Sequence, residues 1–539
     1  MRRHVQKQLL ELAEAVWEGI RCAGSDRQKQ GTEVILQDCF AGIDTIDKAL
    51  SATLYGERYA EYQELLEYVK ELLELLYAES KDLDVGTDLD IGADPGSGMK
   101  VTQIHNALND NLAVLCRELK QEPQVKLEIV FMPYKASMWD CFDSIWKAAD
   151  MDDRCNVSVV PIPYYDKNPD GTIGSFHYEG NSLPQYVETV NYRKYSIQSH
   201  RPDIVYIHNP YDGYNYVTTV PTEYYSGELR KYSELLVYIP YFLASTYTDL
   251  QSALPFVAPV AIVNSNYIVY QSYAQLEMLK GLGLYYNNAL VLGSPKLDYY
   301  AGLKEPGMPQ EKWETCRNFK KTILLTTTLD LLLAQTCGDD PYEWIRYMRL
   351  FLNSILQYDD LAVIWRPHPL MRQTVCSMRN DLVDEYDSLI QEITSYPGCI
   401  LDEQTDSRYA LFYSDALIAD GGSMPMQYMV TEKPVLNIYS NHFDQDLYMA
   451  FDMSGAYFAD QMIYDNWEEF LKLSKEEKQK SRAEGIRRFC EMILRQEDPK
   501  KDERLNAMRM SVVNSDGTAG EKIHKRIAAE AFEEMVDYE

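Results

Sequence analysis

The segment LEIVFMPY, residues 127–134, decides the fold class of this chain. It is a short apolar run in which hydrophobic and polar residues do not alternate, which is typical of a parallel strand buried on both faces. Similar runs follow as VSVVPIPYY (157–165), DIVYIHN (203–209), LLVYIPYF (235–242), VAIVNS (260–265) and ALVLGS (289–294). The intervening patterns predict helices at 138–150, 184–199 and 267–282. This alternation predicts a βαβ series and hence a doubly wound sheet.

The same rhythm starts again after a polar connector at about residues 301–320. Its predicted strands are TILLTTT (322–328), AVIWRPHP (362–369), GCILDE (398–403), DALIAD (415–420) and PVLNIYS (434–440). Helices are predicted between them at about 340–357, 371–395, 405–414 and 424–431, and in a tail at 467–496 and 519–537. Two successive Rossmann-like domains of this α/β class predict the GT-B architecture, whose ligands lie in a cleft facing the carboxyl ends of the strands.

The first part of the chain has a different, helical pattern. Leu9, Leu12, Val16 and Ile20 recur at helical spacing, and residues 1 to about 82 as a whole predict a helical hairpin or small bundle. The stretch LDVGTDLDIGADPGSG (83–98) has no periodicity and predicts a loop, without the spacing of a calcium-binding EF-hand. We therefore expect three parts, at residues 1–120, 121–305 and 306–539.

Composition excludes several classes of function. The formal net charge of −31 argues against a nucleic-acid partner, because phosphate backbones are bound by basic surfaces. There is no apolar run of about 18 residues that predicts a transmembrane helix, and glutamates interrupt the start of the chain where a signal peptide would need an apolar region. Ten cysteines are scattered without metal-ligand spacing, so we expect reduced thiols, no metal site and a cytoplasmic location.

The most specific local pattern is WRPHPL, residues 365–370, directly after a predicted strand. The end of a parallel strand places Arg366 and His368 at the ligand crevice, and the flanking prolines fix the backbone that aims them. Guanidinium and imidazole groups both donate hydrogen bonds to a diphosphate. A plain turn with a surface histidine is the alternative interpretation.

A second pattern, ALIADGGSMPMQYMV at 416–430, runs from a strand into a predicted helix. Gly421 and Gly422 let the backbone approach a phosphate, and Ser423 can cap the helix and donate its hydroxyl. Asp420 ends the strand beside them. Taken alone, this pattern is explained equally well by a simple turn. It indicates a binding site only in combination with the RPHP element.

These two elements, together with LVLGSPKLDYY (290–300) and DGTAGEKIHKRI (516–527), resemble the corresponding elements of CDP-glycerol glycerophosphotransferases in matching order. The resemblance covers roughly residues 125 to 530. It implies a GT-B fold with an acceptor-side domain followed by a nucleotide-donor domain. His368 and Ser423 would then contact the phosphates of a CDP-activated donor. The product would be a polyol-phosphate unit of a cell-surface polymer, transferred to a polymer or lipid-linked acceptor.

The chain departs from the family pattern at several positions. The family's Trp-His-Gly element, with the presumed catalytic base, is replaced by LVYIPYFLAS (236–245), which contains no histidine. A Thr-Trp-Arg element is replaced by Thr328-Leu329-Asp330, so that Thr328 is the matching donor-side residue. On the helix after the glycines, the family has an acidic residue where this chain has Gln427.

We expect His208 or Asp212 to take over the role of the missing base. Both lie in HNPYDGYN (208–215), which follows a predicted strand on the N-terminal side of the cleft. Either could deprotonate an acceptor hydroxyl while His368 and the helix N-terminus stabilise the leaving diphosphate, in a displacement without a covalent intermediate. Each residue also has a purely structural interpretation. His208 could be hydrogen-bonded to the backbone, and Asp212 could cap the start of a helix.

Three functional interpretations follow from these patterns. The first is a transferase that needs neither a metal nor a cofactor. If it contacts the membrane, the contact is peripheral. The second is a catalytically silent GT-B subunit of a polymer-synthesis complex, which the missing base favours. The third is a GT-B enzyme that uses another nucleotide sugar, such as a UDP-sugar transferase or an epimerase.

Overall fold

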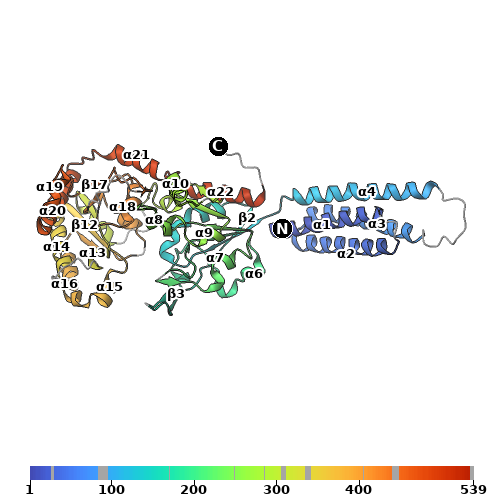
Figure 1. The fold of residues 1–539 in the computed structure, drawn as a ribbon, viewed down its shortest axis with the longest axis horizontal. Helices are drawn as coiled ribbons and strands as arrows, with labels where there is room; N and C mark the ends of the chain where they lie inside the picture. The colour runs from blue at the N-terminus through green and yellow to red at the C-terminus, as the bar shows by residue number, and fades with distance from the viewer. Residues whose placement is uncertain are drawn as a thin grey trace.

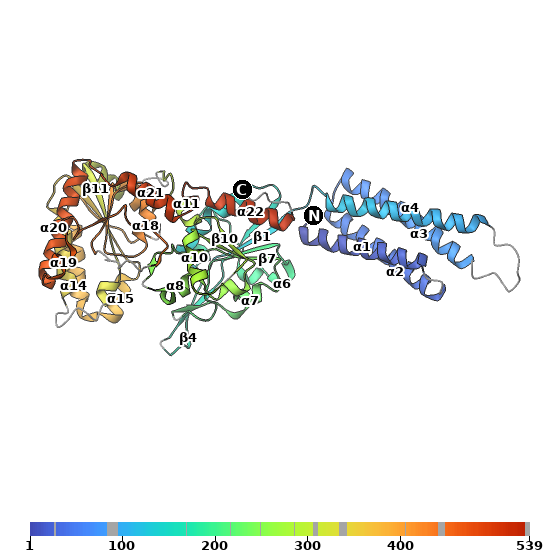
Figure 2. The same cartoon turned by 45° about the horizontal axis from the view of Figure 1, so that its top comes forward.

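The chain forms a helical rod followed by two α/β domains in a row, as Figures 1 and 2 show. The computed structural model describes residues 1–25, 29–82, 95–168, 170–215, 217–247, 249–284, 286–304, 311–333, 342–404, 406–439 and 448–533. Most of the stretch predicted as a loop at 83–98 lies outside the described residues, and its last residues, from Pro95, begin a helix.

The rod is a helical bundle of α1 (Arg3–Ser25), α2 (Lys29–Thr53), α3 (Glu57–Asp82) and α4 (Pro95–Lys120). Aliphatic side chains at helical spacing fill its core, because each helix turns one apolar stripe inward. The bundle is tied to the first α/β domain where the Arg3 backbone N–H donates to the Lys126 carbonyl over 3.0 Å. Lys7 adds an ion pair to Glu234 at 2.8 Å.

The first α/β domain contains a six-stranded sheet of order β10-β9-β7-β5-β1-β2, in which neighbouring strands pair in parallel. Its strands are β1 (Leu127–Met132), β2 (Cys155–Val159), β5 (Ile204–Ile207), β7 (Leu235–Tyr238), β9 (Tyr267–Tyr270) and β10 (Ala289–Val291). Apolar clusters lie on both faces of this sheet, which explains why its central strands are continuous apolar runs. The doubly wound sheet predicted from LEIVFMPY onward is therefore present.

Two predicted elements of this domain were wrong, and a third was right in part. The run VAIVNS forms a short helix, α9 (Ala261–Asn264). The segment predicted as a helix at 267–282 begins with β9 and continues as helix α10 (Tyr273–Gly281). A short apolar run fits a buried helix as well as a strand, so periodicity alone does not separate them. The helix predicted at 184–199 is mostly irregular and contributes only the start of α6 (Ile197–His200).

A small antiparallel sheet that the sequence did not predict lies beside the first domain. It pairs β3 (Tyr164–Lys167) with both β4 (Ile173–His177) and β6 (Thr218–Thr219). Tyr164 and Tyr165 therefore lie on a strand of this small sheet.

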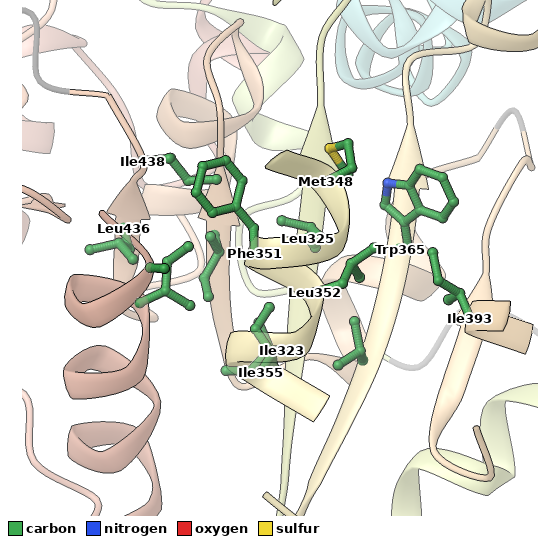
Figure 3. Packing of buried hydrophobic residues seen from close by; sticks show 14 of the residues in the cluster. Ile323, Leu325, Met348, Phe351, Leu352, Ile355, Trp365, Ile393, Leu436 and Ile438 are labelled. Carbon is green, nitrogen blue, oxygen red and sulfur yellow. The ribbon is translucent and has the colours of Figure 1, made fainter. Parts of the chain in front are cut away.

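The second α/β domain has a parallel sheet of order β13-β12-β11-β14-β15-β17. Its strands are β11 (Lys321–Thr327), β12 (Leu361–Pro367), β13 (Cys399–Leu401), β14 (Ala416–Ala419), β15 (Val435–Asn437) and β17 (Tyr457–Phe458). Figure 3 shows Phe351 and Leu352 of α14 (Glu343–Leu356) over Leu325 of β11 and Trp365 of β12. Each such buried side chain contributes on the order of 1.5–3 kcal/mol. The two parallel-sheet domains together form the predicted GT-B architecture.

The C-terminal tail runs from the second domain back to the first. Helices α20 (Lys475–Leu494) and α21 (Lys501–Ser511) cover the second domain, whereas α22 (Ala519–Phe532) packs against α5 (Asp143–Asp150) of the first. The approach is close, because a Cβ built on Gly520 would meet Ser144 Cβ at 2.6 Å. The sequence-based division assigned this tail to the second domain, since chain order does not reveal a return crossing.

Among the residues that the structure describes, no helix combines the length and the apolarity that crossing a membrane requires.

Candidate functional site

The RPHP and DGGS elements meet at one edge of the second sheet. His368 follows β12, Thr328 follows β11 and Asp420 follows β14, and these three strands are neighbours in the sheet. The register places Thr326 opposite both Arg366 and Ala419. Because the strands are parallel, their carboxyl ends coincide and the loops that follow them are brought together.

A cavity of about 280 Å³ lies at this edge, between the two α/β domains. Six of the seven predicted donor-binding residues line it: Thr328, Arg366, His368, Gly421, Gly422 and Ser423. The seventh, Asp420, lines a neighbouring cavity, and its carboxylate accepts a hydrogen bond from the Thr328 backbone N–H over 2.8 Å. Asp420 therefore ties the loop after β14 to the loop after β11.

His368 is held in a defined orientation by two backbone contacts. Its backbone N–H donates to the Thr327 carbonyl over 2.8 Å. Its Nδ1 atom accepts from the Leu370 N–H over 3.1 Å, which places the proton of the neutral ring on Nε2. The imidazole therefore has a donor atom suited to a phosphate oxygen.

Arg366 forms an ion pair with Asp402, whose side chain is fully buried. The side chain of Arg366 is only 10% exposed. A guanidinium has five N–H donors, so pairing with one carboxylate fixes its position without using all of them. Arg366 is therefore a rigid cationic element of the cavity wall.

The loop before α18 (Met424–Met429) has the backbone geometry that only glycine accepts easily. Gly422 has a φ of 78°, and a Cβ at this position would lie 3.2 Å from Thr328 Cγ2. Ser423 follows, and its hydroxyl oxygen accepts a hydrogen bond from Gln427 Nε2 over 3.0 Å. This contact leaves the Ser423 hydroxyl hydrogen to be donated to another acceptor. Gln427 itself is buried and lines the same cavity.

The other polar residues that line this cavity were missed from the sequence. They include Asp140 from the 3₁₀ helix η1 (Ala136–Cys141), Lys296 from α11 (Pro295–Asp298), Tyr300 and Ser407. Lys296 pairs with Asp140, and the Tyr300 hydroxyl lies 3.1 Å from both Asp140 Oδ2 and Ser407 Oγ. Burial raises the pKa of Tyr300, so the phenol stays protonated. Asp140 gave no sequence signal, since it falls inside a segment predicted only as a helix.

The structure corrects the prediction for His208. Its side chain is fully buried and is not among the residues that line either of the two cavities. Nε2 accepts from the Tyr134 backbone N–H over 3.0 Å, and Nδ1 lies 3.4 Å from Cys141 Sγ. Burial lowers the pKa of His208 to about 3. The ring is thus a neutral core group stacked on Phe142.

Asp212 is corrected in the same way. Its carboxylate accepts from the Ser226 backbone N–H over 2.8 Å and from the Ser226 hydroxyl over 2.7 Å. These bonds cap the start of α7 (Ser226–Leu229), so Asp212 has the structural role that was the alternative interpretation. Burial raises its pKa, and it too is absent from the residues that line the two cavities.

A second, more apolar cavity of about 420 Å³ adjoins the first and shares Gly421, Gly422 and Ser423 with it. Its walls include aromatic side chains from both domains: Phe242, Tyr247, Phe256, Tyr439 and Phe458. A short antiparallel ladder between β8 (Thr246–Tyr247) and β16 (Tyr448–Met449) joins the two domains beside it. Phe242 belongs to the predicted strand-end segment LLVYIPYF, of which only this end reaches the cavity.

One group of side chains in the described part of the chain has metal-ligand character. Ligand atoms of Asp152, Cys155 and His524 lie within 4.8 Å of one another, where α22 meets the first domain. Arg154 already donates to both oxygens of Asp152. The Asp152 carboxylate is therefore already engaged with a cationic side chain, and none of the three residues lines either of the two cavities.

Comparison with known proteins finds related folds but no matching family. No family model and no curated protein sequence matches the chain. Similar solved structures include Staphylococcus aureus MnaA with UDP, 16% identical, covering 77% of this chain and 100% of that one with a TM-score of 0.43. A putative UDP-N-acetylglucosamine 2-epimerase from Listeria monocytogenes is 14% identical over 77% and 98% of the two chains, with a TM-score of 0.47. A variant of the wall teichoic acid polymerase TagF is 14% identical over 80% and 99%, with a TM-score of 0.44. At these identities the likeness concerns the fold alone.

Proposed function

We propose that this chain transfers a glycerol-phosphate or related polyol-phosphate unit from a CDP-activated donor to a polymer or lipid-linked acceptor. The observation that carries the proposal is the convergence of RPHP and DGGS on one cavity, in which His368 and Ser423 both offer hydrogen-bond donors. The resemblance of the same two elements to CDP-glycerol glycerophosphotransferases supports cytidine as the nucleoside.

The donor's diphosphate is proposed to bind at the loop from Gly421 to Ser423, beside His368. This wall combines an imidazole N–H, a hydroxyl and a fixed guanidinium, which are the groups that stabilise charge on phosphoryl oxygens. Asp420, which directly precedes this loop, accepts a hydrogen bond from the Thr328 backbone N–H. Fixed donors of this kind act without reorganising when negative charge develops on the leaving phosphate.

The adjoining cavity is proposed to extend the site beyond the diphosphate. Its volume of about 420 Å³, added to a cavity that shares three of its residues, gives room for a nucleotide together with a second substrate. Its aromatic walls suit the apolar face of a polyol or of a nucleoside. This supports two-substrate chemistry at one continuous site.

One observation favours a different function, that of a nucleotide-binding subunit without catalysis. His208 and Asp212, the expected bases, are buried and engaged, and residues 236–245 contain no histidine. Such a subunit would bind the nucleotide through His368 and Ser423 and would release no product.

Calorimetric titration with CDP-glycerol, CDP, CMP and UDP tests the proposal. The wild-type protein is compared with His368→Ala and with His177→Ala, a histidine of β4 that pairs with Asp166 outside both cavities. We expect cytidine nucleotides to bind the wild-type protein and the control, and to bind His368→Ala more weakly. Selective binding of UDP would favour another nucleotide-sugar enzyme, and binding of none of the four would overturn the donor site.

A further inference from the structure

Asp140 is a buried carboxylate that uses only one of its oxygens. Its side chain is 8% exposed, and Oδ2 accepts from both Lys296 Nζ and the Tyr300 hydroxyl. Oδ1 has no hydrogen-bond partner among the described residues. Buried polar atoms are nearly always paired, and a buried carboxylate oxygen without a partner is costly. The arrangement therefore calls for a functional explanation.

The position of Asp140 in the molecule supplies that explanation. It lines the same cavity of about 280 Å³ as His368 and Ser423. The carboxylate belongs to η1 of the first domain, whereas the imidazole and the hydroxyl belong to the second. The cavity thus combines a proton acceptor from the first domain with phosphate-binding donors from the second.

We propose that Asp140 is the general base of the reaction, an inference that rests on the proposed transferase function. The acceptor hydroxyl gives its proton to the Asp140 carboxylate, and its oxygen forms a bond to the phosphorus that carries the polyol. The bond from that phosphorus to the bridging oxygen of the donor breaks, and the electron pair leaves on CMP. His368 and Ser423 hold the departing phosphate.

Lys296 and Tyr300 prepare Asp140 for this role. The ammonium and the phenol both donate to Oδ2, so they fix the orientation of the carboxylate in the cavity wall. A weakly basic carboxylate is sufficient, because phosphoryl transfer has a loose transition state in which the nucleophile loses its proton late. Tyr300 also contacts Ser407 of the second domain, so the position of the base depends on contacts with both domains.

Other carboxylates near the cavity have partners of their own. Asp402 forms an ion pair with Arg366, and Asp420 Oδ1 accepts a hydrogen bond from the Thr328 backbone N–H. Asp143, three residues after Asp140, accepts from Trp139 and Tyr186 at Oδ1 and from Lys147 at Oδ2. Asp143 is not among the residues that line the cavity, which makes it a matched control for a carboxylate of the same segment.

The test compares the wild-type chain with Asp140→Asn, Asp140→Glu and Asp143→Asn in two measurements. The first is the affinity for CDP by calorimetry. The second is CMP release from CDP-glycerol, with a synthetic glycerol-phosphate oligomer as acceptor, followed as a function of pH. Asparagine has the shape of aspartate and still accepts from Lys296, so we expect Asp140→Asn to keep its fold, checked by circular dichroism.

We expect Asp140→Asn to bind CDP as the wild-type chain does and to release CMP about 10²–10⁴-fold more slowly. Its rate should lose the fall at low pH that protonation of the carboxylate causes, and Asp140→Glu should recover part of the rate. Asp143→Asn should keep both the rate and its pH dependence. CMP release by Asp140→Asn at the wild-type rate would overturn the base assignment while leaving the proposed function intact. A wild-type chain that binds no CDP, or binds it and releases no CMP, would overturn both.

Discussion

The hydroxyl oxygens of Tyr300 and Ser407 lie 3.1 Å apart. Tyr300 belongs to the connection between the two α/β domains, and Ser407 precedes α17 (Arg408–Tyr413) of the second. The same phenol reaches Asp140 of the first domain, so one side chain joins three segments that are far apart in sequence. The wall of the candidate site is thus also a contact between the domains.

Replacing Tyr300 by phenylalanine should destabilise the protein. The change removes one donor from the buried Asp140 carboxylate and the partner of the Ser407 hydroxyl, and leaving a buried polar group unsatisfied costs about 1–3 kcal/mol. Thermal unfolding should show a lower midpoint for Tyr300→Phe than for Tyr214→Phe, a control in which the ring is 74% exposed. Equal midpoints for the two variants would mean that the Tyr300 hydroxyl contributes nothing to stability.

His368→Ala should weaken the binding of CDP without changing the fold. A hydrogen bond to a charged group contributes about 1.5–3 kcal/mol, which corresponds to roughly a 10- to 100-fold rise in Kd. Calorimetry on His368→Ala and on the His177→Ala control measures the effect. The same Kd for both variants would place His368 outside the donor site.

Ser423→Ala should also weaken CDP binding, by about 1–2 kcal/mol or a factor of roughly 5–30. Gln427→Leu should produce a smaller loss, because it leaves the hydroxyl in place and removes only the Gln427 donor that orients it. The order of the two effects is the informative result. A larger loss for Gln427→Leu than for Ser423→Ala would show that Gln427 itself contacts the nucleotide.

Gly422→Ala should reduce nucleotide affinity through the backbone. A side chain at a φ of 78° costs on the order of 1–2 kcal/mol, and the new Cβ would also press on Thr328 Cγ2 at 3.2 Å. Gly302→Ala is the matched control, because its φ is 60° and a Cβ there meets nothing within 4 Å. Both variants should lose stability, and only Gly422→Ala should lose CDP affinity by calorimetry. A loss of affinity in both would indicate a global effect of strain.

Asp203 should make the stability of the protein depend on pH. Burial raises its pKa from 3.8 to about 7, and Oδ1 has no hydrogen-bond partner among the described residues. The folded state therefore holds the proton that the unfolded state has released between these two values, so stability falls as pH rises from about 4 to 7. The free energy of unfolding of the wild-type chain should decline over this window relative to that of Asp203→Asn. Parallel curves for the two proteins would contradict the assignment.

The donor-side residues could be found from the sequence because a local rule governs them. Arg366 and His368 lie at the carboxyl end of β12, Ser423 lies in the loop after β14, and the carboxyl ends of neighbouring parallel strands share one edge. The same rule failed for His208, although it also follows a strand. Residues of η1 fold over its ring, and Cys141 and Phe142, which contact it, are more than sixty positions away in the chain.

The sequence by itself determined the two parallel-sheet domains, the helical start of the chain and the loops that carry the phosphate-binding groups. These features depend on apolar periodicity and on strand ends, which are properties of neighbouring residues. Only the tertiary structure decided which carboxylate faces the cavity. Asp140 meets Lys296 and Tyr300 across separations of 156 and 160 residues. Burial and ion pairing are set by contacts between distant segments, so they exist only after the two domains and the connection between them have packed together.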